Sequence, residues 1–321
     1  MRTHTFEFRD HLDFADVLGG KCVVAVGIGP EREAILLTVD PESQTIPFER
    51  DKQSGTSFPR SVVEHPYPAT VFRLKNSRVS RVDLPEVDAA FPHIQPLADD
   101  HTLIVSARCH YRNGNPEQNA VIYDQHGQVI RCMVFGDGIQ DVQVACDQRI
   151  WVSYFDEGVF GNFGWPYPPM GADGLLCFDT DGQIVWQFHA PGGFDSMADC
   201  YALNVANDAV WICYYTNFPV VQITSDGTVQ GWENEFAGVA VLVIDRQRIL
   251  LWGGYDKERN RCIVQAISGG KLVSPQRLKL CLPDGEPLDK ARLIGRGSII
   301  HAFAGTRWYQ FDLRNLPTSF A

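Results

Sequence analysis

Apolar and polar residues alternate over short stretches along most of the chain, the pattern expected of half-buried β-strands. In five places two such strands are joined by a polar turn, and in four of these turns a glycine supplies the positive φ angle that a tight hairpin needs. We name these segments the outer hairpins. They begin at Ala69, Ala120, Gly174, Pro219 and Cys262, and their turn glycines are Gly127, Gly182, Gly227 and Gly270.

A second kind of strand pair precedes each outer hairpin. It consists of a short apolar strand, a turn with Asp, Asn or Gly, and a stronger apolar strand. These inner hairpins begin at Phe14, His93, Asp141, Cys200, Gly238 and Ala291. Inner and outer hairpins alternate, so the chain repeats a four-stranded unit of roughly 40–55 residues, the size of a propeller blade.

The repeat predicts an all-β fold, a six-bladed β-propeller with four-stranded antiparallel blades in a single domain over residues 1–321. After the sixth inner hairpin only the strand RWYQFDLRNL remains, so we expect THTFEFR (3–9) to supply the missing outermost strand and close the ring. Closure would remove an exposed sheet edge. Insertions are expected at about 39–67 and 156–173. The alternative is seven blades, if residues 34–50 form an additional hairpin.

Several turns resemble those of known propeller repeats. The stretches YDQHGQV, FDTDGQIVW and ITSDGTV are similar to turns of quinoprotein-like and WD-like propellers. Residues 151–165 (WVSYFDEGVFGNFGW) resemble a stretch of uncharacterised bacterial β-propeller proteins. The resemblance implies a fold and brings no activity. The complete Gly-His to Trp-Asp repeat of WD proteins is not present.

The charge composition of the chain excludes some classes of binding partner. The chain has 28 Lys and Arg against 39 Asp and Glu, a net charge of −11, which argues against nucleic acid and against an anionic membrane as partner. The start MRTHTFEFRDHLDF has no apolar stretch of the kind found in a secretory signal. Nine cysteines, without zinc-binding spacing, indicate free thiols. We therefore expect a cytoplasmic protein.

Function is expected on the face that carries the long loops, because a rigid scaffold commonly presents binding residues on such loops. In a propeller this face collects the connections from inner to outer hairpins and those between blades. The candidate ligand-binding residues there are Arg108, His110, Arg112, Asp137, Asp156, Glu157, Asn162, Trp165, Tyr215, Asn217, Tyr255 and Asp256.

Oxygen-bearing residues suggest a metal site. Asp156 and Glu157 directly follow an apolar strand, and with Asp137 and Asn162 they offer the oxygen ligands that Ca²⁺ takes. Ca²⁺ is the one cofactor that the sequence suggests. The alternative is that these are turn residues, since Asp and Asn are common in turns for local reasons.

Arg108, His110 and Arg112, together with His93, form a basic cluster on an acidic chain. Arginine grips a carboxylate or phosphate through two hydrogen bonds, so the cluster suggests an anionic ligand. The alternative is that the arginines pair with Asp137, Asp156 or Glu157 of the next blade, because buried arginines are usually paired.

The second insertion is rich in aromatic residues and proline. Phe160, Phe163, Trp165 and Tyr167, with three prolines, form either a lid or an anchor for a protein partner. The alternative is a small core of their own. These two interpretations stay open.

The chain lacks G-x-S-x-G and H-E-x-x-H motifs, so no nucleophile or zinc-protease constellation is visible. The favoured hypothesis is a propeller that binds a small anionic ligand or a protein partner. The alternative is a Ca²⁺-dependent hydrolase or lactonase that acts at the mouth of the central channel. Whether the protein is an enzyme stays undecided at this stage.

Overall fold

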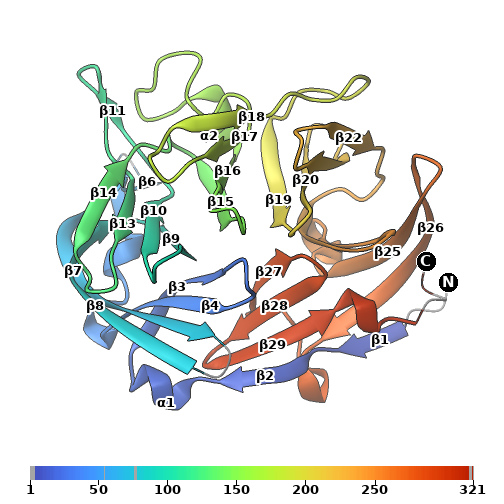
Figure 1. Cartoon of the computed structure of the whole chain (residues 1–321), viewed down its shortest axis with the longest axis horizontal. Coiled ribbons are helices and arrows are strands. Elements are labelled where there is room, and N and C mark those ends of the chain that lie inside the picture. The colour runs from blue at the N-terminus through green and yellow to red at the C-terminus, as the bar shows by residue number, and fades with distance from the viewer. Residues whose placement is uncertain (1–3, 54, 76–77, 318–319, 321) are drawn as a thin grey trace. The chain divides into compact units, whose positions relative to one another are not determined.

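The computed structural model describes residues 4–53, 55–75, 78–317 and 320. The fold is all-β, and six main sheets form the blades of a β-propeller (Figure 1). The prediction of an all-β fold with six blades is confirmed. The chain divides into two compact units of three blades each: the first unit comprises residues 17–188, and the second comprises residues 1–16 with 189–321.

Blades one to three make up the first unit, and each is an antiparallel meander of four strands. Their innermost strands contact one another, with β9 between β3 and β15. The strands are β3 (Cys22–Ile28), β4 (Ala34–Val39), β7 (Val62–Lys75) and β8 (Arg78–Ala89); β9 (Pro92–Pro96), β10 (Thr102–Ser106), β13 (Ala120–Tyr123) and β14 (Val129–Met133); and β15 (Ile139–Val144), β16 (Ile150–Tyr154), β17 (Leu175–Phe178) and β18 (Ile184–Gln187).

Blades four to six make up the second unit, in which β23 contacts β19 and β27. The strands are β19 (Asp199–Val205), β20 (Ala209–Tyr215), β21 (Val220–Thr224) and β22 (Val229–Trp232); β23 (Val239–Asp245), β24 (Arg248–Gly253), β25 (Arg261–Ser268) and β26 (Lys271–Cys281); and β27 (Arg292–Arg296), β28 (Ile299–Ala304) and β29 (Arg307–Asp312), with β1 (His4–Glu7) and β2 (Arg9–Asp13).

Short elements fill the connections. Two small hairpins, β5–β6 and β11–β12, and two short helices lie outside the blades. None of the described helices is long and apolar enough to cross a membrane. The elements are β5 (Arg50–Gln53), β6 (Thr56–Pro59), β11 (Tyr111–Arg112), β12 (Asn115–Pro116), α1 (Ala15–Leu18), α2 (Asp156–Phe160), and the 3₁₀ turns η1 (Pro41–Ser43), η2 (Ile46–Phe48), η3 (Asp256–Glu258), η4 (Pro283–Gly285) and η5 (Leu313–Asn315).

The N-terminal segment completes the sixth blade, but not with the residues predicted. The outermost strand is β2 (9–13), which pairs with β29, whereas residues 4–7 form β1 and lie parallel to β26 of the fifth blade. The break falls at Phe8, which is 2% exposed and whose N–H donates to the carbonyl of Cys281. The chain passes from the fifth blade to the sixth at this buried residue. Residue 3 of the predicted strand lies outside the described residues.

The first inner hairpin also differs from the prediction. We expected it over residues 14–29, but the pair is β3–β4 (22–39), and residues 15–18 form helix α1. The N–H of Phe14 donates to the carbonyl of Thr306, so this stretch continues the pairing of β2 with the sixth blade. The seven-blade alternative is not realised, because β4 ends at residue 39 and residues 41–48 contain the turns η1 and η2.

Buried polar groups join neighbouring blades at their innermost strands. In the second unit the Asn204 side chain donates to the carbonyls of Leu242 (2.8 Å) and Gly297 (2.9 Å) and accepts from the N–H of Gly297 (2.7 Å). One amide thus bridges blades four, five and six. In the first unit a Cβ atom at Gly27 would lie 2.0 Å from the carbonyl oxygen of Ile94, so only glycine permits this approach of β3 to β9.

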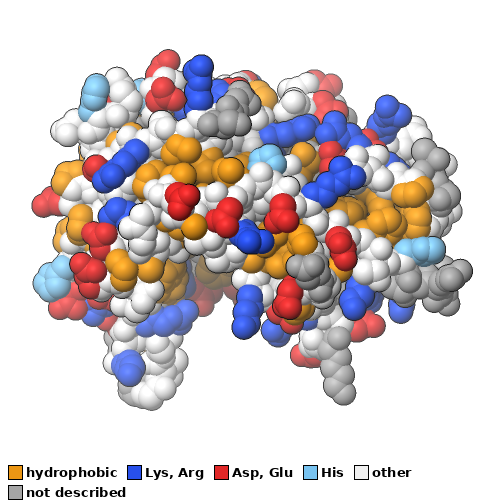
Figure 2. Space-filling view, turned by 90° about the horizontal axis from the view of Figure 1, so that it is seen from below, with side chains coloured by type: hydrophobic (Ala, Val, Ile, Leu, Met, Phe, Trp, Pro, Cys, Tyr) orange, Lys and Arg blue, Asp and Glu red, His pale blue; other side chains and the backbone are white. Residues whose placement is uncertain are grey.

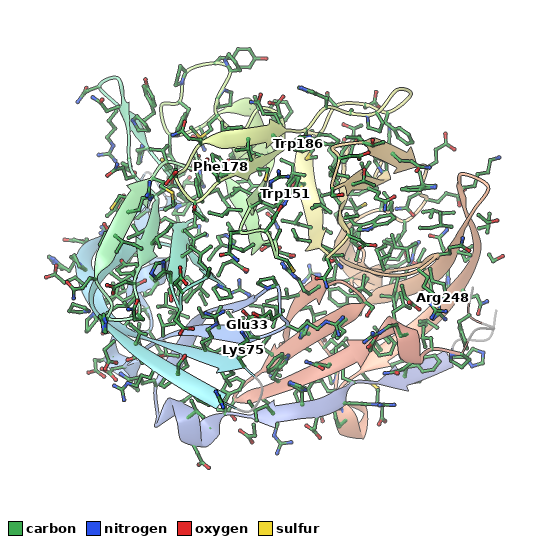
Figure 3. The ribbon with its side chains drawn as sticks, in the orientation of Figure 1. Glu33, Lys75, Trp151, Phe178, Trp186 and Arg248 are labelled. Atoms are coloured by element: carbon green, nitrogen blue, oxygen red, sulfur yellow. The ribbon has the colours of Figure 1, made fainter. Side chains whose placement is uncertain are left out.

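Packing within the blades follows the alternation seen in the sequence. In blade three the rings of Trp151 on β16 and Trp186 on β18 lie 5.3 Å apart between centroids (Figure 3). In blade five Arg248 pairs with Asp245 at 2.6 Å and donates to the carbonyl of Leu316 at 3.2 Å, which ties the C-terminal segment to β24. On the side drawn in Figure 2, acidic and basic side chains are interspersed among hydrophobic ones.

Candidate functional site

A buried ion pair joins the loop that follows β10 within blade two to the loop that enters β15 of blade three. The Arg108 guanidinium donates through Nε to Oδ1 of Asp137 (2.9 Å) and through Nη2 to Oδ2 (3.0 Å). Arg108 is 6% exposed and Asp137 is 3% exposed. The backbone N–H of Cys109 donates to the same carboxylate at 2.8 Å. Charge-assisted bonds of this two-pronged kind fix both partners in orientation.

Helix α2 brings a second carboxylate to the same arginine. Nη2 of Arg108 lies 2.5 Å from Oε2 of Glu157. The helix can approach because Gly138, with φ +68°, faces Gly158, and a Cβ at position 138 would lie 2.3 Å from the Gly158 nitrogen. The two glycines therefore bring α2 against the loop that carries Asp137.

The aromatic insertion packs in part on this ion pair. The guanidinium carbon of Arg108 lies 4.2 Å from the centre of the Phe163 ring, and the His110 ring lies 4.1 Å from the same ring. Trp165 donates from Nε1 to the carbonyl of Cys109 at 2.7 Å. Beside it, the N–H of Tyr111 donates to the carbonyl of Phe163, which holds β11 against the insertion (Figure 1).

Two other aromatic residues of the insertion face solvent. Phe160 is 62% exposed and Tyr167 is 87% exposed. Within the insertion, Phe163 and Trp165 thus pack against the blade, whereas Phe160 and Tyr167 are exposed.

The four residues predicted to bind Ca²⁺ have other partners in the structure. Asp137 and Glu157 surround Arg108. Oδ1 of Asp156 accepts from the N–H of Glu157, and Oδ1 of Asn162 accepts from the N–H of Phe163, both at 2.8 Å. Among the described residues no group of three or more His, Cys, Asp or Glu side chains is placed to hold a metal ion. This arrangement agrees with the two alternative interpretations: Asp137 and Glu157 pair with an arginine, and Asp156 and Asn162 form local turn hydrogen bonds.

A cleft of about 750 Å³ opens beside this cluster, within the first unit. Three of the predicted binding residues line it, His110, Arg112 and Asn162, together with Phe163 of the aromatic insertion. The opposite wall was not predicted and comes from the first insertion, which includes Phe58, Arg60, Val62 and Glu64.

Charges in the cleft are mixed. Arg60 is surrounded by acidic groups, with Asp51 and Glu64 at 2.8 Å and Glu49 at 3.2 Å. Its hydrogen bond to Glu64 holds the pKa of that carboxyl below its usual range. Arg112 is less engaged, because its Nε lies 3.9 Å from Oε1 of Glu117. Arg112 is therefore the cation of this cleft that is most available to a ligand.

The remaining predicted residues belong to the second unit. Tyr255 donates from its hydroxyl to the Tyr201 hydroxyl at 2.9 Å, and burial, followed by this hydrogen bond, raises the pKa of Tyr255 well above its usual value. The rings of Tyr215 and Tyr255 both contact Phe218, with centroids 5.7 and 6.2 Å away.

Asn217 and Asp256 are the sequence neighbours of two residues of this aromatic cluster, Phe218 and Tyr255. The Asn217 amide donates to Oδ2 of Asp195 at 2.7 Å, and Asp256 begins the turn η3 with φ +49°. Tyr201 and Phe218, whose rings pack against this cluster, were not among the predicted residues. Their alternation within apolar runs was the same as that of ordinary core residues.

Residues 171–311 match the model of the YxzG family. This stretch runs from the end of the second insertion to β29. No curated protein sequence matches the chain.

The chain is also similar to solved propeller structures at low identity. Virginiamycin B lyase from Staphylococcus aureus is 10% identical, with 95% of this chain and 99% of that chain covered and a TM-score of 0.40. XC5397, a gluconolactonase from Xanthomonas campestris, is 12% identical, with 96% and 95% covered and a TM-score of 0.43. Kluyveromyces lactis Hsv2 is 13% identical, with 94% and 79% covered and a TM-score of 0.49.

Proposed function

We propose that this protein is a binding protein and that the loop-rich face of its first unit takes a protein partner. The observation that carries the proposal is the pair of outward-facing rings, Phe160 and Tyr167, on an insertion whose other rings are fixed to the buried Arg108 cluster. Exposed aromatic residues on a rigid support are typical hot spots of interfaces.

The cleft beside the insertion suggests the chemistry of the partner segment. Arg112 is the available cation, and Phe58 and Val62 are 44% and 41% exposed on the opposite wall. A segment with one acidic side chain next to apolar residues would pair with Arg112 and cover Phe58. A highly acidic partner segment is less favourable, because this chain has a net charge of −11 and would repel it at long range.

A small anionic ligand is the second candidate. The cleft volume of about 750 Å³ falls in the range of small-molecule sites. His110 and Arg112 would supply donors to a carboxylate or phosphate. The Ca²⁺-dependent hydrolase is less well supported, because Asp137 and Glu157 would have to leave Arg108 before they could bind a cation.

Affinity capture with a surface variant tests the proposal. In the double variant Phe160→Ala and Tyr167→Ala we expect at least a tenfold loss of the proteins captured specifically by the wild type, as measured by quantitative mass spectrometry. The matched control is Ile130→Ala, which removes a 49% exposed side chain from β14, and it should retain them. Equal capture by all three proteins would refute the role of the insertion.

A further inference from the structure

A second cleft lies within the second unit, among residues that the proposed function does not use. It has a volume of about 810 Å³ and is lined by residues at and after β22 of blade four and by residues of β25 and β26 of blade five. Ile263 and Gln265 of β25 line it together with Leu272 and Pro275 of β26, and Phe194 and Phe236 add apolar surface. Its size suits a small molecule.

A bulge shapes this cleft opposite Gln265. The pairing of β25 with β26 moves from Val264 with Gln276 to Ala266 with Val273, so β26 contains one residue more than β25 there. Within the bulge Ser274 has φ +53°, and Pro275 has no N–H to donate. Bulges of this kind often lie next to functional sites, where they redirect side chains.

Two buried polar atoms at the cleft lack a hydrogen bond. Gln265 is only 7% exposed, and its Oε1 has no partner in the described part of the chain. The same holds for Nε of Arg261, although Nη1 of that residue pairs with Glu258 at 2.9 Å and its guanidinium lies 4.3 Å from the Phe236 ring centre. An unpaired buried polar group is costly, so a ligand that pairs both atoms gains affinity.

The charges around the cleft favour an anion. The lining contains three basic residues, Arg261, Lys271 and Arg277, against two acidic ones, Glu233 and Glu235. Within the described ranges Lys271 and Arg277 make no ion pair. Because Glu258 already pairs with Arg261, Lys271 and Arg277 are the two cations of the lining that can meet an anion.

We propose that this cleft binds a hydroxylated organic acid, a small molecule with one carboxylate or phosphate and at least one O–H donor. Arg277 pairs in register with Ile263, two residues from Gln265, and two residues of a strand span about 7 Å. The acid group would pair with Arg277 and Arg261, and a hydroxyl would donate to Oε1 of Gln265. This oxygen lies just below the cleft surface, and the terminal torsion of glutamine is broad enough to turn it toward the ligand.

Isothermal titration calorimetry with four probes of similar size tests the proposal. D-glucuronate and glucose 6-phosphate both combine an acid group with hydroxyl groups. The acid group is a carboxylate in the first and a phosphate in the second. Glucose lacks the acid, and cyclohexanecarboxylate lacks the hydroxyls. We expect at least one hydroxylated acid to bind with a Kd below about 1 mM, and both controls to bind at least tenfold more weakly. If neither hydroxylated acid binds at 10 mM, or glucose binds equally well, the proposal is wrong.

Variants place the binding in this cleft. Gln265→Met and Arg277→Met should each weaken binding at least tenfold, whereas Lys279→Met, an exposed position of β26 that does not line the cleft, should not. Gln265→Met should also leave the Tm at or above the wild-type value, because no hydrogen bond of Oε1 is lost. Unchanged affinity in Gln265→Met, or a clearly lower Tm, would overturn the proposed role of the glutamine.

Discussion

Asp137→Asn is the most direct perturbation of the Arg108 cluster, because it keeps the side-chain shape and removes the charge. The Asp137 carboxylate accepts from Nε and Nη2 of Arg108 and from the N–H of Cys109. Removing one partner of a buried ion pair typically costs about 3–5 kcal/mol, because the other charge is left uncompensated.

Glu157 moderates the expected loss in this variant. Its Oε2 lies 2.5 Å from Arg108 and still offers a counter-charge, but the side chain is 42% exposed and solvent screens it. We therefore expect a loss of about 3 kcal/mol in the free energy of unfolding, at the lower end of that range. This corresponds to a change of roughly 100-fold or more in the unfolding equilibrium.

Urea unfolding followed by circular dichroism and tryptophan fluorescence measures the loss. Asp156→Asn is the matched control, because Asp156 is an exposed neighbour whose carboxylate bonds locally to the N–H of Glu157. It should change the free energy by less than about 0.5 kcal/mol. A loss below 1 kcal/mol in Asp137→Asn, or equal losses in both variants, would refute the account of a buried pair.

Three further predictions concern the thiols, the approach of α2 and the C-terminal segment. The native protein should react rapidly with a thiol reagent at the exposed Cys132 and Cys146, while the six buried thiols react only after urea unfolding; early labelling of all nine would contradict this. Gly138→Ala should lower the free energy of unfolding by more than about 1 kcal/mol, because alanine is strained at φ +68°, and an unchanged urea midpoint would refute the close approach of α2. Burial by itself would raise the pKa of Asp312, but its hydrogen bonds with Arg314 outweigh burial and lower it. Its contribution to stability should thus be present above about pH 4 and be lost as the pH falls through the lowered pKa, and Asp312→Asn should weaken this acid dependence in urea titrations.

Strand alternation was enough to predict most of the blades, because the three inner strands of each blade bury one or both of their faces and repeat the same pattern. It failed at residues 14–18, where the backbone of Phe14 pairs with Thr306, a partner almost 300 residues away that no local pattern reveals. The same limit applied to the candidate site. The segments bearing Arg108, Asp137 and Glu157 could be placed on one face, but whether the carboxylates would hold a cation or the arginine depended on distances between loops.

The cleft wall formed by residues 58–64 escaped prediction for a related reason. The insertion that contains this wall has little periodicity in its sequence. Arg60 holds the wall together through ion pairs with the carboxylates at positions 49, 51 and 64. Charge clusters of this kind are built by folding and have no fixed spacing in a sequence.

The pairing of the first strands with the last blades has a consequence for how the chain is made. Residue 4 pairs with residue 278 and residue 9 with residue 310, so β1 and β2 have no partner until the chain has been extended to these positions. At about 5–20 residues per second, that interval is roughly 15 to 60 s on the ribosome. Residues 17–188 can gather their three blades during this time, whereas strands β1 and β2 must wait with their edges unpaired. These strands carry the charged residues Glu7, Arg9, Asp10 and Asp13. Charge on an unpaired strand discourages association with neighbouring nascent chains during this interval.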